Sequence, residues 1–436
     1  MSDAKGSFKP YLGLTFLIGF GFFTMGLMDI LYDSYVPIFL GSYIKANWLI
    51  GAIMTLDNVL AVFLIPFVSL WSDNARTKIG RRMPFIIVLL PLSAVTFSLI
   101  PYAARESLVS LILLVGGLNL FKQSVRGPVV ALMPDTIPGE FRSEANGVIN
   151  TMGALGAIIS TVGLARLMGV DMVLPFLGRT KDALPFPIAG LCVVLATLLV
   201  FFFVRERNRD AAAKEERVPL VASLKAIAGE KDKSALWILI ALFFWFWGYQ
   251  GILPFIAKFS VEVLGTSNAN ATLPASAVAI AQLLFAIPSG YVAHRIGRKR
   301  ALRISLLALV VILLVGGYLA SPLAEALGSG ARFYALMGIM FLYGIFWITI
   351  ITNSFPMLWQ MASFGTIGVY TGLYYTFSQA AAITAPWLTG ALIDIVGYPG
   401  IFVFAALCMG VAMAVMSLVR KGEPHDDPKG LEASVA

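Results

Sequence analysis

The sequence is poor in charged residues, cysteine and histidine, and each shortage excludes a class of protein. Of the 436 residues, 13% are charged, two are cysteine and two are histidine. Soluble domains carry about 25% charged residues, and no polar stretch here is long enough to form one. Two cysteines and two histidines supply neither a disulfide framework nor a metal-ligand cluster. There is also no phosphate-binding loop and no nucleophile elbow, so we expect no enzymatic activity, no metal and no cofactor.

Long apolar runs are abundant instead. Hydrophobic residues make up 58% of the chain, and the mean hydropathy is +0.84. Runs of roughly 20 apolar residues, the length that a helix needs to cross a bilayer, recur from end to end. We therefore predict an all-α polytopic membrane protein. Its twelve expected spans are residues 11–38, 47–71, 84–103, 107–132, 144–169, 185–204, 235–258, 272–293, 300–320, 331–356, 365–390 and 398–419.

The basic residues gather in alternate loops, and this pattern predicts the topology. The net charge of +8 is therefore a topology signal, not the mark of a nucleic-acid partner. Bases near the N-terminus, in the 76–82 and 295–303 turns and after the last span place both termini in the cytoplasm. We expect a monomer in a plasma membrane of the bacterial inner-membrane type. The first apolar run is expected to be retained as a helix and not removed as a signal peptide.

The polar segment 205–234 divides the chain into six spans and six. We predict an N-terminal bundle over 1–204, a cytoplasmic linker over 205–234, a C-terminal bundle over 235–420 and a tail over 421–436. The first part of the linker is expected to be a solvated charged segment. Its second part places Leu220, Val221, Leu224 and Ile227 on one helical face, as in a helix lying along the membrane surface. A receptor or scaffold without transport activity is the alternative that this helix leaves open.

The two halves of the chain contain similar turns. SLWSDNARTKIGRRMPF, residues 69–85, follows the second span, and GYVAHRIGRKR, residues 290–300, follows the eighth. Two parallel six-helix repeats describe the major facilitator superfamily, and the whole chain resembles that superfamily. Its signature is Gly-x-x-x-Asp-x-x-x-Gly-Arg-(Arg/Lys). Here the first glycine is Ser69, and the gap from Asp73 to Gly80 is longer. The resemblance implies that Asp73, Arg81 and Arg82 form contacts that close the cytoplasmic side.

The longer turn is similar to that of the sucrose-transporter type of proton–sugar symporter and of the broader glycoside–cation symporters. The shared run is Ser72-Asp73…Gly80-Arg81-Arg82-x-Pro84-Phe85. A second block agrees through Gln123, Gly127-Pro128, Ala131-Leu132, Asp135 and Arg142. Plant sucrose carriers place an arginine just after Gly-Pro, whereas Arg126 precedes it here. The resemblance implies proton-coupled uptake of a disaccharide, oligosaccharide or glycoside by alternating access.

Ionisable residues also occur inside the predicted spans, where a charge costs about 3 kcal/mol or more. Helical rise places Asp29 about 27 Å along the first span and Lys122 about 18 Å from the end of the fourth, so they reach similar depths. We predict that the acids carry the coupling proton: Asp29, Asp33 and Asp57. We predict substrate binding by polar residues of the fourth span: Asn119, Lys122, Gln123 and Arg126. A static network of salt bridges between the helices is the alternative.

The second half has aromatic and amide side chains in place of buried charge. A sugar site combines aromatic faces with a few hydrogen-bonding groups. We predict substrate binding by Tyr249, Gln250, Trp347, Asn353, Tyr374 and Gln379. The superfamily resemblance favours those of the seventh and tenth spans, because these spans line its central cavity. The alternative for the aromatic residues is a place in the interfacial belts of the membrane.

Two further questions stay open at the level of the sequence. The chain lacks the Gly-Pro-x-x-Gly-Gly run of drug–proton antiporters; the fifth span instead has glycines suited to close helix packing, Gly147, Gly153, Gly156 and Gly163. The alternative cargo is an organic anion, a lipid or a drug, carried by uniport or antiport, with Lys122 and Arg126 as an anion clamp. The coupling ion is expected to be H⁺, with Na⁺ as the alternative.

Overall fold

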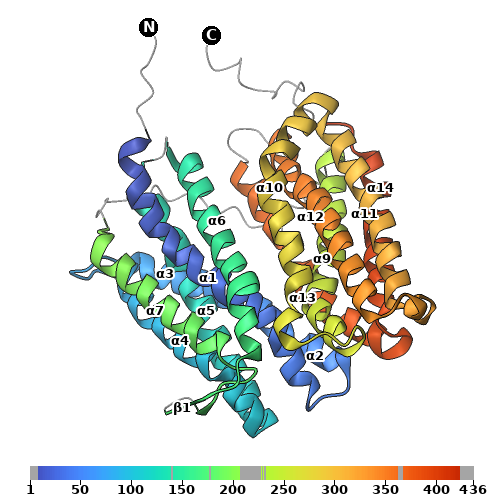
Figure 1. Ribbon diagram of the computed structural model, residues 1–436. Helices are drawn as coiled ribbons and strands as arrows, with labels where there is room; N and C mark the ends of the chain where they lie inside the picture. Colours follow the sequence, from blue (N-terminus) through green and yellow to red (C-terminus); the bar gives the residue numbers. More distant parts are fainter. Residues whose placement is uncertain are drawn as a thin grey trace, which may run out of the picture. The chain divides into compact units, whose positions relative to one another are not determined.

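A computed structural model confirms the predicted all-α membrane architecture (Figure 1). The structure describes residues 8–138, 141–175, 178–206, 227, 229, 232–361 and 367–422. Within these ranges, 12 helices are long and apolar enough to cross a membrane. Every one of them overlaps a predicted span. Of the amphipathic helix predicted in the linker, Ile227 is described and buried, while Leu220, Val221 and Leu224 lie outside the described residues, as does most of the predicted tail.

The helices group into two compact units. The first unit comprises Met1–Tyr43, Leu56–Lys214 and Ser267–Ser276, and the second comprises Ile44–Thr55, Glu215–Thr266 and Ala277–Ala436. The units therefore differ from the two halves of the sequence by two short segments, one from each half.

The first unit contains one segment for each of the first six spans. In chain order these are α1 (Lys9–Gly41), α3 (Leu56–Asn74), α4 (Met83–Glu106), α5 (Leu108–Thr136), α6 (Arg142–Ile158) and α7 (Pro185–Phe203). The fifth span continues beyond α6 as η2 (Ile159–Gly163) and η3 (Leu164–Gly169), followed by a hairpin of β1 (Val173–Leu174) and β2 (Gly178–Arg179). α1 packs against α6 and α7, while α4 packs between α5 and α7 (Figure 1). The short helix η4 (Asn268–Asn270) contacts η3.

The second unit is assembled around α9. Its helices are α2 (Asn47–Met54), α9 (Ser234–Glu262), α10 (Leu273–Ile296), α11 (Arg298–Ala320), η5 (Pro322–Leu327), α12 (Ser329–Trp359), α13 (Ile367–Val396) and α14 (Pro399–Leu418). The first turn of α10, up to Ser276, belongs to the first unit. α9 packs against α13 and α14, α11 packs against α12 and α14, and α2 packs against α13. The second span breaks at Thr55, between α2 and α3, so its two parts belong to different units.

Local chemistry explains several helix ends. Proline occupies the first turn of α1, α4, α7 and α14, where its missing N–H is not needed. Ser107 caps α5 by accepting a hydrogen bond from the Ser110 amide. Large apolar side chains stay exposed on the helix surfaces, among them Phe63, Phe67 and Leu113. In a chain that spans a membrane, such surfaces face lipid.

Glycine brings α1 and α6 into close contact. A Cβ atom added at Gly26 would clash with the carbonyl oxygen of Gly153, and one at Gly156 would clash with the carbonyl oxygen of Phe23. Gly147 and Gly163 have nothing within 4 Å of such an atom. Of the four glycines predicted to pack closely, Gly153 and Gly156 therefore lie at the α1 contact and the other two do not.

We predict that Gly156→Ala lowers the thermal stability of the purified protein, because the new methyl group meets backbone that cannot move without shifting α1. Overpacking of this kind costs about 1–3 kcal/mol. Gly147→Ala in the same helix is the matched control, and it should be neutral or slightly stabilising because alanine favours a helix by about 1 kcal/mol over glycine. Thermal denaturation in detergent, followed by loss of the monodisperse peak, measures both. Equal melting temperatures for the two variants would contradict the packing.

Candidate functional site

An ion pair between α1 and α5 lies inside the membrane-spanning part of the first unit. The Nζ atom of Lys122 donates to Oδ1 of Asp29 at 2.9 Å. The Lys122 side chain is 4% exposed and that of Asp29 is 30% exposed. The same ammonium lies 4.7 Å from the centroid of the Tyr32 ring, within cation–π range. Asn119 Nδ2 in turn donates to the Tyr32 hydroxyl at 2.8 Å.

Helix periodicity explains why these groups meet. Residues three and four apart share one helical face, so α1 presents Asp29, Tyr32 and Asp33 together. α5 presents Asn119, Lys122 and Arg126 in the same way. Each charge of the Asp29–Lys122 pair stabilises the other, because a buried charge that loses its partner destabilises a protein by about 3–5 kcal/mol. The structure thus brings together the predicted residues of the first and fourth spans.

The other two predicted acids lie within electrostatic range of this pair. Asp57 is in the first turn of α3, where its Oδ1 accepts from the amide and side chain of Asn58 at 2.6 and 2.8 Å. Asp33 is half-buried on α1 and has no hydrogen-bond partner in the described chain. Arg126 also interacts electrostatically with Asp29. We call the five residues the coupling cluster: Asp29, Asp33, Asp57, Lys122 and Arg126.

Two amide oxygens beside the cluster have no donor. Oδ1 of Asn119 and Oε1 of Gln123 are buried, and neither accepts a hydrogen bond from any described residue. A buried polar atom without a partner costs about 1–3 kcal/mol. Arg126, one turn beyond Lys122, is exposed and makes neither a hydrogen bond nor an ion pair in the described chain. The face of α5 therefore carries two buried acceptors without donors and one exposed cation.

The second unit holds a stack of aromatic rings. Tyr249 of α9 stacks on Trp347 of α12, with ring centroids 4.3 Å apart and an angle of 6° between the planes. Tyr343, one turn before Trp347, extends the stack with centroids 6.2 Å apart. Phe246 contacts the edges of both Trp347 and Tyr374. This aromatic cluster joins three predicted residues, and Trp347 and Tyr374 in it are buried.

Tyr343 was not predicted from the sequence, although its position four residues before Trp347 places both residues on one helical face. Its buried hydroxyl has no hydrogen-bond partner among the described residues.

Three predicted residues of the second unit, Gln250, Asn353 and Gln379, make no ring contact or hydrogen bond with the aromatic cluster among the described residues. Asn353 is buried, and its Nδ2 donates to the carbonyl oxygen of Thr349 in its own helix at 2.8 Å. Gln250 and Gln379 are half-buried. Among the described residues, no group of three or more His, Cys, Asp or Glu side chains is placed to hold a metal ion.

The basic turn between α3 and α4 forms a compact charged cluster. Arg82 pairs with Asp73, and its Nε donates to Oδ2 of Asp135 at 2.9 Å. Arg81 Nη2 donates to the other oxygen of Asp135 at 2.7 Å. Partial burial acts to lower the pKa of Arg81, but the hydrogen bond and negative charge of Asp135 outweigh it and raise that pKa. The predicted contact residues Asp73, Arg81 and Arg82 are thus brought together.

Glu206 is a correction to the sequence analysis, which expected a solvated residue at the start of the linker. One carboxylate oxygen accepts from the Arg81 amide at 2.7 Å, and the other accepts from the amides of Arg82 and Met83 at 2.8 and 2.7 Å. These groups begin α4, where a negative charge also favours the helix dipole. We call the five residues the turn cluster: Asp73, Arg81, Arg82, Asp135 and Glu206. Sequence reasoning gave no role in it to Asp135.

A second polar network holds α2 in the second unit. Asp394 of α13 accepts from the amides of Asn47 and Trp48 at 2.9 and 3.0 Å and from Asn47 Nδ2 at 2.8 Å. Lys258 of α9 donates to Asn47 Oδ1. Asn47 begins the span Asn47–Asn74, so this network lies at the opposite end of that span from the basic turn. No short sequence motif could have revealed it.

The 12 apolar helices among the described residues indicate a multi-pass membrane protein. The chain belongs to the Major Facilitator Superfamily, whose family model matches residues 14–275 and 261–435. This confirms the superfamily predicted from the repeated turns. The superfamily consists of transporters and not of enzymes.

Individual relatives are distant. The sucrose transport protein SUC3 of Arabidopsis thaliana is 25% identical over 218 residues, which cover 43% of this chain and 35% of that protein. The cis,cis-muconate transport protein of Acinetobacter baylyi is 25% identical over 271 residues, which cover 60% of each. The matches thus span less than two thirds of either relative.

Solved structures agree on the fold alone. The nucleoside transporter NupG has a TM-score of 0.66 at 14% identity and covers 95% of this chain and 100% of its own. A bacterial homologue of the iron transporter ferroportin has a TM-score of 0.71 at 12% identity, again covering 95% of this chain and 100% of its own.

We predict that Glu206→Gln destabilises the start of α4, because the amide keeps one acceptor oxygen for three backbone donors and turns an N–H₂ group toward them. The expected loss is about 1–3 kcal/mol, seen as a lower melting temperature and faster proteolysis within residues 76–82. Glu106→Gln, at the exposed opposite end of the same helix, is the matched control. A Glu206→Gln protein as stable and as protease-resistant as the Glu106→Gln protein would refute the assignment.

Proposed function

We propose that this chain is a proton-coupled symporter of a sugar, namely a disaccharide, oligosaccharide or glycoside, working by alternating access. The observation that carries the proposal is the pair of buried acceptors, Asn119 Oδ1 and Gln123 Oε1, next to the Asp29–Lys122 ion pair. Sugar hydroxyl groups are donors of the kind that these oxygens lack. A neutral polyol can satisfy both without adding charge to a site that already holds several.

Charge counting supports the coupling of a proton. The coupling cluster contains three carboxylates and two bases, so one carboxylate has no compensating cation within the cluster. One bound proton makes the cluster neutral. We propose that Asp29 takes this proton, that Asp33 and Asp57 share its charge, and that Lys122 is then released to donate to the substrate. Loss of the proton restores the ion pair and favours release of the sugar.

The aromatic cluster is a second observation that supports a carbohydrate as the substrate. Aromatic rings bind the apolar C–H faces of sugars, and polar groups at their edges bind hydroxyl groups. Tyr249 is the half-buried ring of the stack, and the Tyr343 hydroxyl is a buried polar group without a partner among the described residues. We propose that Tyr249, Trp347 and Tyr374 form an aromatic wall and that Gln250, Asn353 and Gln379 contribute amide contacts.

The turn cluster would act as the cytoplasmic gate. Its five charged residues tie α3, α4, α5 and the segment after α7 together. Weakening these contacts would let the helix ends separate during transport. The proposal includes a monomer in a bacterial inner membrane with both termini in the cytoplasm, as the distribution of bases indicates.

A second candidate is the transport of an organic anion. It is favoured by the exposed Arg126, which has no hydrogen bond or ion pair in the described chain, and by the similarity to a cis,cis-muconate transport protein. In that case Lys122 and Arg126 would bind the carboxylates of the substrate.

The test is uptake into liposomes that hold the purified protein. A panel of disaccharides, glycosides and dicarboxylates is offered with and without an inward pH gradient, and with a Na⁺ gradient as a separate arm. We expect uptake of at least one sugar, stimulated by acid outside, and no uptake of dicarboxylates. Dicarboxylate uptake without sugar uptake would establish the second candidate in place of the first.

We predict that Asp29→Asn lowers gradient-driven sugar uptake by at least roughly tenfold, because the amide cannot exchange a proton and cannot compensate Lys122. Asp29→Glu should retain part of the activity. Glu325→Gln removes an exposed carboxylate and serves as the control. Uptake by Asp29→Asn that still responds fully to the pH gradient would remove Asp29 from the coupling step.

Arg126→Gln separates the two cargoes. For a neutral sugar we expect a weaker apparent affinity, because one hydrogen-bonding group is exchanged for another. For an organic anion the loss of the exposed cation should abolish saturable uptake at every concentration measured. The dependence of uptake on substrate concentration distinguishes the two results.

A further inference from the structure

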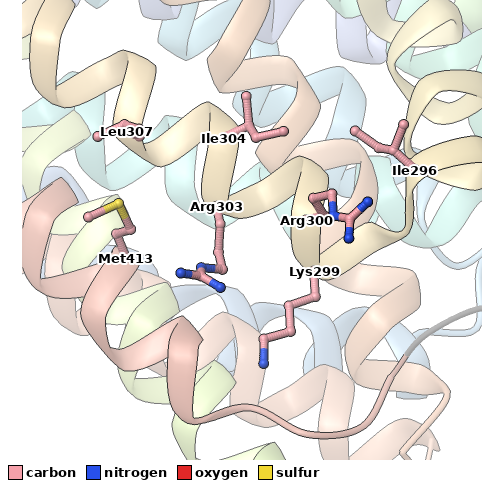
Figure 2. Close-up of a pocket in the computed structure, with 7 residues that line it drawn as sticks. All are labelled: Ile296, Lys299, Arg300, Arg303, Ile304, Leu307 and Met413. Carbon is pink, nitrogen blue, oxygen red and sulfur yellow. The ribbon is translucent and has the colours of Figure 1, made fainter.

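A cavity of about 530 Å³ opens at the start of α11, and none of its lining residues belongs to the coupling cluster, the aromatic cluster or the turn cluster. Three bases, Lys299, Arg300 and Arg303, line it together with Ile296, Ile304, Leu307 and Met413. Figure 2 shows Lys299 and Arg303 extending toward one side of α11, with Met413 approaching from α14. The cavity thus combines a basic end with an apolar wall, and all its residues belong to the second unit.

The corresponding turn of the first half pairs its arginines with carboxylates. Gly80 and Gly297, the glycines that precede the basic runs, both have positive φ angles, +109° and +91°. In the first turn, Asp73 and Asp135 pair with the two arginines. In the second turn, Arg298 donates to the amide oxygen of Gln360 at 2.6 Å, and two further arginines, Arg300 and Arg303, line the cavity.

Of the three bases that line the cavity, one makes hydrogen bonds within the described chain and two make none. Lys299 Nζ donates to the carbonyl oxygens of Ser417 and Val419 at the end of α14. Arg300 and Arg303 are exposed, and neither makes a hydrogen bond or ion pair within the described chain. They also lie in the first two turns of α11, where the helix dipole adds further positive potential. This end of the cavity attracts an anion.

The apolar wall shows which kind of anion fits. Ile304 is 49% exposed and Leu307 is 53% exposed, on the same helix as the arginines. Leu307 lies about 10 Å along that helix from Arg300, so the surface passes from basic to apolar over the depth of a lipid headgroup and its first methylene groups. A free phosphate would use only the basic end.

We propose that this cavity binds an anionic phospholipid, with the phosphodiester between Arg300 and Arg303 and the acyl chains along Ile304 and Leu307. Basic pockets at the cytoplasmic ends of transmembrane helices suit such headgroups, and each nearby base strengthens binding by roughly fivefold. The bound lipid would compensate the charges of Arg300 and Arg303, as carboxylates compensate Arg81 and Arg82 in the first turn. The proposal does not depend on the transported substrate.

The test measures bound lipid by native mass spectrometry of the full-length protein released from detergent micelles. Phosphatidylglycerol, phosphatidylcholine and soluble glycerol phosphate are offered separately at matched concentrations. For the unaltered protein we expect a retained adduct with phosphatidylglycerol and at least roughly tenfold less with the other two. R300Q/R303Q should lower the phosphatidylglycerol adduct by roughly tenfold or more.

The matched control is R76Q/K78Q, which removes two exposed bases from the first turn and should leave the adduct unchanged. Equal adducts for R300Q/R303Q and the unaltered protein would overturn the proposal, as would an equal loss in the control, which would reveal attraction to overall charge. Retention of glycerol phosphate as strongly as phosphatidylglycerol would identify a phosphate site and refute a lipid site. If R300Q/R303Q proves unstable, Ile304→Asn with both arginines intact provides the second measurement, and the proposal requires that it also lower the phosphatidylglycerol adduct.

Discussion

The ammonium of Lys122 inside a membrane-spanning helix is the constraint on which the first unit depends. A charge in this environment must be compensated, since its transfer from water costs several kcal/mol. Asp29 compensates it at 2.9 Å, and the Tyr32 ring contributes its face. Asn119 then holds the Tyr32 hydroxyl. One buried cation therefore fixes the register of α1 against α5. Beside it, the amide oxygens of Asn119 and Gln123 accept no hydrogen bond from any described residue.

The same requirement is met differently in the two basic turns. Arg82, 4% exposed, is compensated by carboxylates from α3 and α5, and Glu206 binds the amides at the start of α4. In the turn of the second half, Arg298 donates to the amide oxygen of Gln360, and Arg300 and Arg303 are exposed. The two turns thus share a glycine with a positive φ angle, while two arginines of the second turn stay exposed.

The sequence predicted what depends on local pattern and missed what depends on distant partners. Span positions follow from hydropathy, and the shared face of Asp29, Tyr32 and Asp33 follows from helical spacing. Glu206 is 125 residues from Arg81, and Asp394 is 347 residues from Asn47. Both carboxylates bind backbone amides, which leave no trace in residue identity. The orphan oxygens of Asn119 and Gln123 could not be predicted either, because an amide is conspicuous only once its neighbours are known to offer no donor.

Charge balance also bears on the choice between a sugar and an organic anion. The coupling cluster has three acids and two bases, so a neutral sugar with one proton leaves it neutral. A dianion with one proton would leave two negative charges in a region where each uncompensated charge costs about 3 kcal/mol or more. Two further protons would have to enter with the dianion to reach the same balance. Arg126 does not neutralise the extra negative charge, because it is already one of the two bases of the cluster. On the proposed mechanism, charge balance among α1, α3 and α5 would therefore favour a neutral cargo, for the same reason that Lys122 requires Asp29.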